Sequence, residues 1–393
     1  MNILQGKPMR TPILILMSAI GVIGANSLLL SPVVTAVSQT LDATTAEVMR
    51  AASAYGLGVA AAALLLAPLG DRIGAGRLMR AALLLLGAGL GASAAAPDVW
   101  TLMAAQAVCG LAAGAALPSI YTLAMVIAPK GREARVLGYV LAGWTVSMVL
   151  GVSVSAWATD LAGWRAVYGT LAGVALTLWA ASSPMRAAGS PSGQATSPLT
   201  ALRVPGIFRG LLATALLMMG FYCSYFFTGA HITQALGLST TQAGLLPLFY
   251  GIGFGLAVLL DPLLDRLGLA RATAPVLLAV TASYLLMMAV APQYLLLLGA
   301  ALVWGMFQHL ALNLLVARLT ALEPAQRGAI MGLYSTVTYL CVFAAPFAGG
   351  LLFAGWGLAG CLGLSAFLAL SGAAEAFGLR RKPGGALPAS SAT

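Results

Sequence analysis

Three residues in one apolar stretch, Gly305, His309 and Asn313, are spaced by four positions and therefore share one face of a helix. Histidine changes its charge near physiological pH, so His309 could carry a proton or bind a polar substrate. An ionisable side chain inside an apolar span is costly and is a functional candidate by default. A neutral histidine that is hydrogen-bonded within a helix bundle is the alternative.

Other polar and aromatic side chains inside apolar stretches are candidates for the same pathway. An aromatic ring with a polar group suits a cavity that is partly apolar and partly polar, although each ring could equally serve packing or an interfacial belt. The candidates for a substrate or proton pathway are Asn26, Tyr55, Gln106, Trp144, Tyr222, Tyr225, His309, Asn313, Tyr334 and Tyr339. Asp261 and Glu375 lie near the ends of two stretches, where we expect surface or gating roles. Asp261 becomes a candidate proton acceptor if its helix is shifted.

No set of residues suited to catalysis or metal binding accompanies these candidates. The sequence lacks a phosphate-binding glycine loop followed by Lys-Ser or Lys-Thr, so direct use of ATP is not expected. The four cysteines (Cys109, Cys223, Cys341 and Cys361) fall inside apolar stretches without metal-ligand spacing, and we expect them to be buried packing residues. We therefore predict no enzyme activity, no cofactor and no metal site.

The elements that must position these residues are membrane-spanning helices. Apolar residues make up 60% of the chain and charged residues only 8%, whereas a soluble domain carries about 25% charged residues. Stretches longer than about 18 apolar residues indicate spanning helices, and no alternating pattern of a barrel is seen. We predict an all-α membrane protein with twelve transmembrane helices, at residues 12–36, 46–69, 78–96, 99–128, 136–158, 163–182, 208–232, 242–262, 273–291, 295–318, 329–352 and 357–378.

The basic residues predict the orientation of these helices. Of the 20 lysines and arginines, only Arg50 and Arg165 fall on the side opposite the N-terminus. Because basic residues accumulate on the cytoplasmic side, both termini are predicted to be cytoplasmic. The net charge of +10 then reflects topology and gives no indication of nucleic-acid binding. The first apolar run is interpreted as a span and not as a cleavable signal peptide.

One short segment occurs twice, about half a chain apart. Residues 67–77 read APLGDRIGAGR and residues 261–271 read DPLLDRLGLAR. Each copy separates two apolar stretches, which is typical of a duplicated membrane protein with a site between its halves. A carboxylate at Asp71 or Asp265 could cap the start of a neighbouring helix and interact with its positive dipole end. A solvated turn whose charges only enforce topology is the alternative.

The chain divides once. Residues 184–207 are rich in Pro, Gly, Ser and Thr, which is linker composition. We therefore predict two pseudo-symmetric six-helix bundles, at residues 1–183 and 208–393, joined by a cytoplasmic linker at 184–207. The two halves also keep the same spacing beyond this repeat. Gly110 corresponds to Gly305. The same separation in sequence relates Pro129, Arg132 and Ala134 to Pro324, Arg327 and Ala329.

The repeated turn resembles a motif of the major facilitator superfamily, which reads roughly G-x-L-A-D-R-x-G-R-R between helices 2 and 3. Leu69, Asp71, Arg72 and Gly74 match it, with Arg77 one place beyond the basic positions. The resemblance implies that this turn latches the two bundles on the inner side and breaks when the protein faces inward. The residues of the implied latch are Asp71, Arg72, Gly74, Arg77, Arg132, Asp265, Arg266, Gly268, Arg271 and Arg327.

The fifth helix is similar to that of the arabinose-efflux and drug:proton antiporter branch. Gly151 and the Gly163-Trp164-Arg165 corner match, whereas Ser153 and Ser155 stand where that branch has a proline and a glycine associated with antiport. Gln106 stands where relatives carry a buried arginine linked to proton movement. Asn26 is the central polar residue of the first helix, where many antiporters have an acid.

The resemblance implies a secondary transporter that works by alternating access about a central site between the bundles. The expected task is export of a small organic molecule such as a drug, sugar or metabolite, with proton exchange as the implied energy source, by a monomer in a lipid bilayer. Uptake by symport or facilitated diffusion is one alternative. A non-transporting membrane sensor or scaffold is another.

Overall fold

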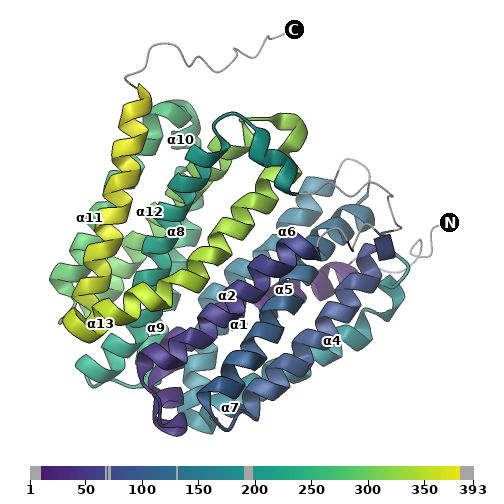
Figure 1. Ribbon diagram of the computed structural model, residues 1–393, viewed down its shortest axis with the longest axis horizontal. Coiled ribbons are helices and arrows are strands. Elements are labelled where there is room, and N and C mark those ends of the chain that lie inside the picture. The colour runs from purple at the N-terminus through teal and green to yellow at the C-terminus, as the bar shows by residue number, and fades with distance from the viewer. Residues whose placement is uncertain (1–9, 67–68, 70–71, 130–131, 190–197, 381–393) are drawn as a thin grey trace.

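The computed structural model describes residues 10–66, 69, 72–129, 132–189 and 198–380. Within this part of the chain the regular elements are all helical (Figure 1). Asp71 of the implied latch lies outside the described residues. The long helices are α1 (Arg10–Leu41), α2 (Thr45–Leu65), α4 (Ala75–Ala94), α5 (Val99–Ile127), α6 (Glu133–Val146), α7 (Val152–Ala181), α8 (Ile207–Ala230), α9 (Thr240–Leu256), α11 (Leu269–Val290), α12 (Tyr294–Thr320) and α13 (Arg327–Arg380).

Short helical turns connect or extend several of these helices. A π-helical turn at Ser147–Gly151 joins α6 to α7, and another at His231–Ala235 extends α8. A 3-10 turn at Ala257–Leu260 leads from α9 into the short α10 (Asp261–Leu267). Three further 3-10 turns lie at Ser183–Met185, Pro198–Arg203 and Pro324–Gln326.

The described helices form ten continuous stretches that are long and apolar enough to cross a membrane. Two of them are broken by a glycine at positive φ, Gly163 in α7 (φ 81°) and Gly357 in α13 (φ 61°). Glycine adopts such angles without the steric cost that other residues meet. Figure 1 shows α13 reversing its direction within one helix label. Divided at these two glycines, the ten stretches give the twelve predicted spans.

Several helix starts are fixed by side-chain caps. Thr44 and Glu47 form a reciprocal capping box at the start of α2, and Ser239 and Gln242 form another at the start of α9. Asp98 accepts a hydrogen bond from the Thr101 backbone N–H at the start of α5 (2.8 Å), and this bond lowers the pKa of the Asp98 carboxyl below its usual range.

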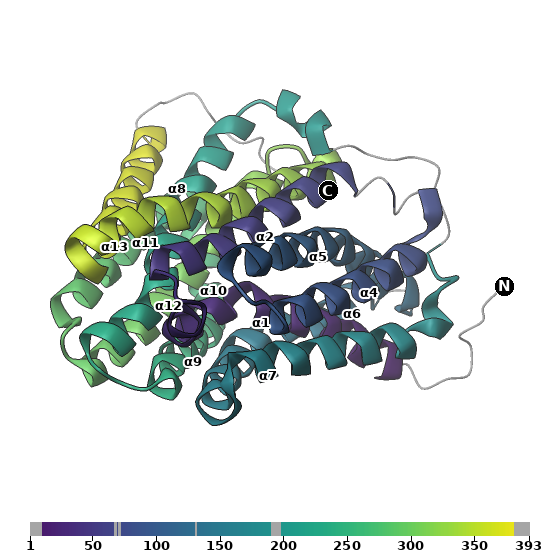
Figure 2. The ribbon, with the colours of Figure 1, turned by 60° about the horizontal axis from the view of Figure 1, so that its bottom comes forward.

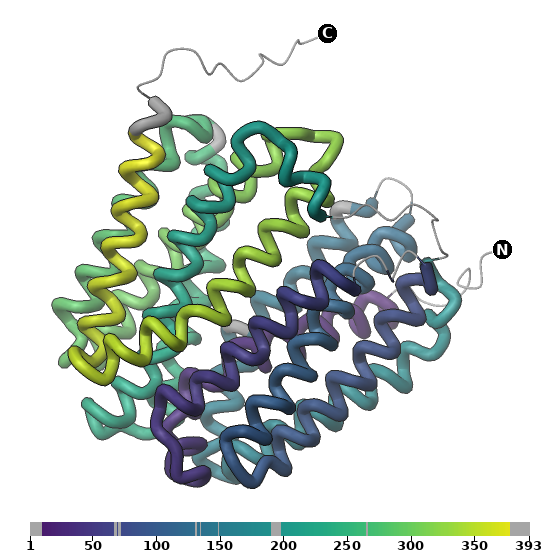
Figure 3. The backbone as a smooth tube through the Cα atoms, in the orientation of Figure 1, coloured from purple at the N-terminus to yellow at the C-terminus, as the bar shows by residue number. Residues whose placement is uncertain are grey.

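The helices lie in two groups, as Figure 3 shows by colour. The first group contains α1, α2 and α4–α7, and the second contains α8–α13. Helices of the two groups are in contact through α2 with α13, α7 with α9 and α1 with α8. Figures 1 and 2 both show α2 beside the first part of α13. A Cβ atom on Gly229 of α8 would collide with the Ser31 carbonyl oxygen of α1, so glycine permits this close approach.

One end of the molecule is closed by polar contacts between the groups. We call it the closed end; α1 ends there and α2 and α9 begin there. The Ser31 hydroxyl donates to the Tyr225 carbonyl oxygen (2.5 Å), and the hydroxyls of Thr35 and Thr233 lie 2.6 Å apart. At the same end, the backbone N–H and hydroxyl of Thr241 donate to the Asp160 carboxylate, at 2.7 and 2.6 Å.

The opposite end, where α1 begins and α13 ends, we call the terminal end. Gln234 adds to the closure at the other end, because its Nε2 donates to the hydroxyls of Thr35 (3.2 Å) and Thr45 (2.9 Å).

Candidate functional site

A cavity of about 260 Å³ lies between the two groups of helices. Its wall comes from α2, α5 and α6 of the first group and from α8, α9, α12 and α13 of the second. The lining residues are Val59, Ala63, Gly114, Leu117, Pro118, Tyr121, Trp144, Met218, Phe221, Tyr222, Tyr250, Phe254, Gln308, Leu312, Tyr334, Ser335, Thr338 and Tyr339. All of these residues are uncharged. We call this space the central cavity.

Aromatic side chains dominate the wall of the central cavity. Trp144, Tyr222, Tyr334 and Tyr339, which the sequence indicated, line it together with Tyr121, Phe221, Tyr250 and Phe254, which it did not. The rings pack against one another behind this surface. Phe221 stacks on Tyr225 with ring centroids 5.3 Å apart. Tyr250 contacts Trp304 with centroids 4.7 Å apart. Tyr225 and Trp304 therefore support the wall from the interior.

Gln308 brings the one primary amide group to this wall, and sequence reasoning did not single it out. Its side chain is 2% exposed, and neither its Oε1 nor its Nε2 has a hydrogen-bond partner. The sequence does carry a signal for Gln308, because a glutamine is rare inside an apolar helix, but the adjacent His309 is ionisable and is the stronger signal. The central cavity therefore combines aromatic faces with an unpaired amide.

His309 lies beside the central cavity and contacts other partners. Its Nε2 lies 3.4 Å from Oδ2 of Asp261 and 2.9 Å from Nδ2 of Asn313, and that Nδ2 lies 3.2 Å from Oδ1 of Asp261. The ring of Phe254 packs edge-on against the imidazole, with centroids 4.6 Å apart. The predicted pair His309 and Asn313 is thus joined by Asp261 from the start of α10. We call these three residues the His309 trio.

The hydrogen bonds of the His309 trio fit two protonation states of the imidazole. When Nε2 is unprotonated, it accepts from the Asn313 amide, whose other hydrogen reaches Asp261. When Nε2 carries a proton, it has the Asp261 carboxylate as an acceptor. Asp261 and Asn313 also line a second cavity of about 370 Å³ near the terminal end. The side chain of Asp261 is 34% exposed and that of His309 only 10%, so the carboxylate is the more accessible of the two groups.

The trio does not have the composition of a metal centre. Within the described ranges, no group of three or more His, Cys, Asp or Glu side chains is close enough to hold a metal ion. The cysteines Cys109, Cys223, Cys341 and Cys361 are all buried free thiols.

Comparison with known sequences identifies the kind of protein to which this arrangement belongs. Residues 16–315 and 210–392 match the profile of the Major Facilitator Superfamily. The chain belongs to the major facilitator superfamily. It is therefore a multi-pass membrane transporter of the secondary type and not an enzyme.

Individual members of the superfamily are similar to the chain over most of its length. It is 28% identical to "Uncharacterized MFS-type transporter YwfA" of Bacillus subtilis over 328 residues, which cover 81% of this chain and 80% of that protein. It is 28% identical to "Transcription regulatory protein OpdE" of Pseudomonas aeruginosa over 292 residues, covering 71% and 72%. The crystal structure of the nucleoside transporter NupG has the same fold, with a TM-score of 0.75, 15% sequence identity and coverage of 95% of this chain and 99% of that one.

Asn26 and Gln106 form hydrogen bonds with each other inside the first group. The sequence had placed both of these amides in the substrate or proton pathway. Asn26 Nδ2 donates to Gln106 Oε1 (3.1 Å), and Gln106 Nε2 lies 3.3 Å from Asn26 Oδ1 and 3.0 Å from the Ser93 hydroxyl. Neither residue lines the central cavity. Tyr55 is also buried away from it, with its hydroxyl 3.5 Å from the Ile23 carbonyl oxygen. The amides of Asn26 and Gln106 are thus satisfied by partners within the first group.

The Gln106→Leu substitution is expected to lower the free energy of unfolding of the transporter by about 1–3 kcal/mol, because it leaves the buried Asn26 amide without partners. Ser93 keeps its bond to the Gly89 carbonyl oxygen (2.9 Å). Denaturant titration of the purified protein in bicelles measures the change. The double substitution Asn26→Leu, Gln106→Leu is the control and should recover most of the loss. Equal stability of the single variant and the wild type would contradict this structural role.

The latch residues are described in part. The side chain of Asp265 is not among the described ones, and the side chains of Arg72, Arg77, Arg132, Arg266, Arg271 and Arg327 are exposed at the terminal end. The two repeated glycines adopt the same backbone conformation, with φ 93° and ψ 140° at Gly74 and φ 76° and ψ 150° at Gly268. Each immediately precedes a helix. Glycine is required because other residues are strained at positive φ.

The fifth-helix motif lies where the two groups meet. Gly151 ends the π-helical turn, and the Ser153 hydroxyl donates to the Val149 carbonyl oxygen (3.0 Å). Gly244 of α9 packs against Ser153 and Ala156. The helix therefore has an irregular turn at this interface, although Ser153 stands where the branch that this helix resembles has a proline. Ser155 is buried nearby in α7.

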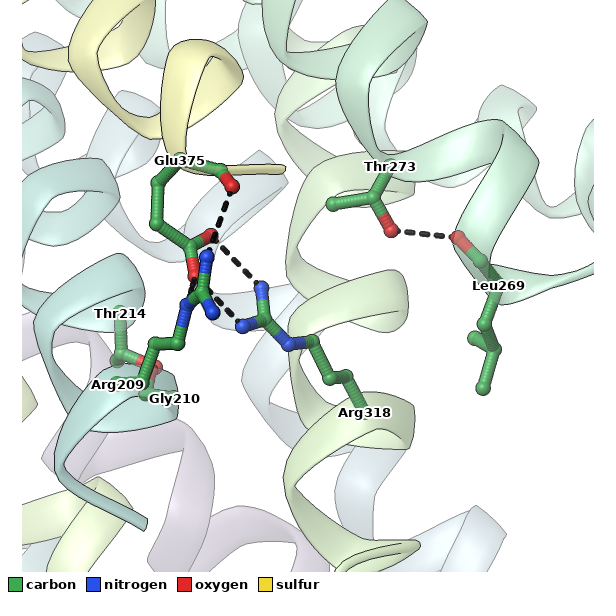
Figure 4. Close-up of polar contacts among 7 residues, drawn as sticks. All are labelled: Arg209, Gly210, Thr214, Leu269, Thr273, Arg318 and Glu375. Carbon is green, nitrogen blue, oxygen red and sulfur yellow. Dashed lines mark hydrogen bonds and ion pairs between the residues drawn. The ribbon is translucent and has the colours of Figure 1, made fainter. Parts of the chain in front are cut away.

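A charged cluster at the terminal end joins α8, α12 and α13 of the transporter (Figure 4). Arg318 donates from both terminal nitrogens to the Glu375 carboxylate, at 2.9 and 2.8 Å, and Arg209 forms a second ion pair with the same carboxylate. Arg209 also donates to the Glu375 carbonyl oxygen (3.2 Å). These residues are far apart in the sequence, which indicated only that Glu375 lay near a helix end. The cluster ties three helices of the second group together.

Proposed function

We propose that the chain transports a small, uncharged organic molecule through the central cavity by alternating access. The observation that carries this proposal is the position of the cavity, which has walls from both groups and lies on the terminal side of the closed end. Aromatic faces without charges favour a flat, neutral solute, because a charged solute would lose its hydration without a compensating partner. Trp144, Tyr222, Tyr334 and Tyr339 are the contacts proposed from the sequence.

The moving bodies in this proposal are the two six-helix bundles at residues 1–183 and 208–393, linked through 184–207. The basic residues support an orientation with both termini and the terminal end in the cytoplasm of a bacterial cell, with the chain in the inner membrane. The central cavity then belongs to an inward-facing state. A monomer has both halves of the cavity and is the proposed functional unit.

Proton-coupled efflux is the proposed mode, with the His309 trio as the proton site. Histidine and aspartate in hydrogen-bond contact, open to water on one side, can exchange a proton with the cytoplasm. The fifth-helix resemblance to the arabinose-efflux and drug:proton antiporter branch favours export. Uptake by symport or a uniporter is the alternative, favoured by the neutral residues Asn26 and Gln106 and by Ser153 in place of proline.

A membrane sensor is the second candidate function. The relative OpdE is named as a transcription regulatory protein, and this name favours a signalling role for this chain as well. Such a protein would bind its ligand in the same cavity without moving it across the membrane.

Flux into liposomes distinguishes these candidates. The purified protein would be reconstituted with an internal pH dye and challenged with a panel of neutral drugs, sugars and nucleosides. Leu312→Trp, which fills the central cavity, is expected to lower flux to below about a tenth of wild type, because the solute loses its site. Leu296→Trp, at an exposed position of the same helix outside the cavity, is the matched control and should leave flux unchanged.

Two results would count against transport through this cavity. Equal flux in the wild type and the Leu312→Trp variant would place the pathway elsewhere. Ligand binding by the wild type without flux of any panel member would favour the sensor.

A further inference from the structure

Gln308 is a buried amide whose hydrogen-bonding capacity is unused. Both amide atoms are inaccessible to water in this conformation and have no protein partner. Buried side-chain amides in folded proteins are nearly always paired, because an unpaired donor or acceptor has lost its hydration without compensation. The unpaired amide of Gln308 lies on the wall of the central cavity, where a bound molecule can supply the missing hydrogen-bond partners.

The comparison with Gln106 shows that the fold can satisfy such an amide when its role is structural. Gln106 is buried to the same degree, and its two amide atoms contact Asn26 and Ser93. Gln308 has no such neighbour, although a glutamine has enough rotatable bonds to turn its amide toward the cavity. The unused donor and acceptor are therefore available for recognition.

The chemistry of an unpaired amide limits the ligands that can satisfy it. Its Oε1 needs a donor and its Nε2 needs an acceptor, about 2 Å apart on one side of the side chain. A ligand with an N–H group next to a carbonyl presents both on one edge and forms two parallel hydrogen bonds. A lactone, ether or tertiary amide offers acceptors only and leaves Oε1 unpaired.

The rest of the cavity selects the shape and charge of the ligand. Phe221, Tyr250 and Phe254 line the cavity with aromatic rings, against which a planar molecule can pack. The uncharged lining gives no counter-charge to an anion or a cation.

We propose that Gln308 is the specificity-determining residue of the central cavity and recognises planar, uncharged molecules that carry a lactam or carboxamide edge. This inference rests on the proposed function of the cavity as the substrate site. It goes further by naming the chemical group that the site requires.

Carbostyril and coumarin are the probes for this proposal. They are planar, uncharged bicyclic molecules of the same shape, and they differ by a ring N–H in the lactam against a ring oxygen in the lactone. Equilibrium binding to the purified protein in nanodiscs is expected to favour carbostyril by about 10- to 100-fold, since the lactone leaves a buried acceptor unpaired. The Gln308→Met variant, of similar length and without hydrogen-bonding groups, is expected to bind both probes equally.

Two controls separate this proposal from its alternatives. Gln293→Met, an exposed position just before α12, should keep the wild-type preference. The unfolding temperature of Gln308→Met should match or exceed that of the wild type, since the unpaired amide is removed.

Each remaining outcome overturns one of the two proposals. Equal binding of both probes by the wild type, or binding of neither, would overturn the role of Gln308. Persistence of the carbostyril preference in Gln308→Met would do so as well. Probe binding that Leu312→Trp leaves intact would count instead against the central cavity as the substrate site.

Discussion

A disulfide between Thr35→Cys and Thr233→Cys is expected to stop transport almost completely, and its reduction to restore it. The two hydroxyls lie 2.6 Å apart across the closed end, one on α1 and one in the π-helical turn after α8. Side chains this close suit the short Cβ–Cβ separation of a disulfide. Because alternating access requires this end to open, a covalent bond there should trap one state and lower flux to below about a tenth of the uncrosslinked value.

The measurement is flux in proteoliposomes before and after reduction, in a background in which the four buried cysteines are replaced by alanine. Ser224→Cys, Ser365→Cys is the matched control. Those hydroxyls are also 2.6 Å apart, but both lie within the second group. Oxidation of the control pair should leave flux unchanged if each group moves as one body. Full activity of the oxidised Thr35–Thr233 pair would mean that the closed end does not open during transport.

The Asp261→Asn substitution is expected to abolish substrate-driven proton movement while solute exchange continues. Asparagine keeps the size and the hydrogen-bonding positions of the carboxylate, so the contact with Asn313 can be retained. It removes the negative charge that faces Nε2 of His309 at 3.4 Å. Without that charge the protonated imidazole loses its acceptor, and coupled proton flux should fall by at least about tenfold.

The internal pH dye and a labelled solute report the two fluxes separately in the same liposomes. His309→Ala, measured in parallel, should show the same loss of coupling. Asp98→Asn is the control, because it removes a carboxylate at a helix start where asparagine is an equally good cap. Wild-type proton movement in Asp261→Asn would exclude the His309 trio as the proton site.

The fold was predictable because lipid imposes strong constraints on sequence. Apolar stretches and the distribution of basic residues indicated the helices, and the duplicated turn indicated two related halves. The sequence predicted loops between residues 158 and 163 and between residues 352 and 357. The structure has helix there instead, and the only non-helical residue within each helix is Gly163 or Gly357. Asp71 lies outside the described residues, so the latch stays a prediction.

The site was harder to predict than the fold because the helices are apolar on all sides. Such helices carry no amphipathic pattern from which their rotation can be read. Tyr222 and Tyr225 both looked like cavity residues, yet Tyr222 lines the central cavity and Tyr225 packs behind it. Phe221 and Phe254 resembled ordinary core residues. Asp261 was considered as a helix-end acid and as a proton acceptor if its helix is shifted, but its contact with His309 was not predicted because the two positions are far apart in the chain.

Gln308 and His309 are consecutive residues of α12, one at the central cavity and the other in the His309 trio. Successive side chains of a helix point about 100° apart, so a small rotation of α12 about its own axis alters the surroundings of both. If the two residues bind solute and proton as proposed, the sites influence each other directly through one rigid element. Thermodynamic reciprocity then requires that protonation change solute affinity by the same factor by which bound solute changes proton affinity.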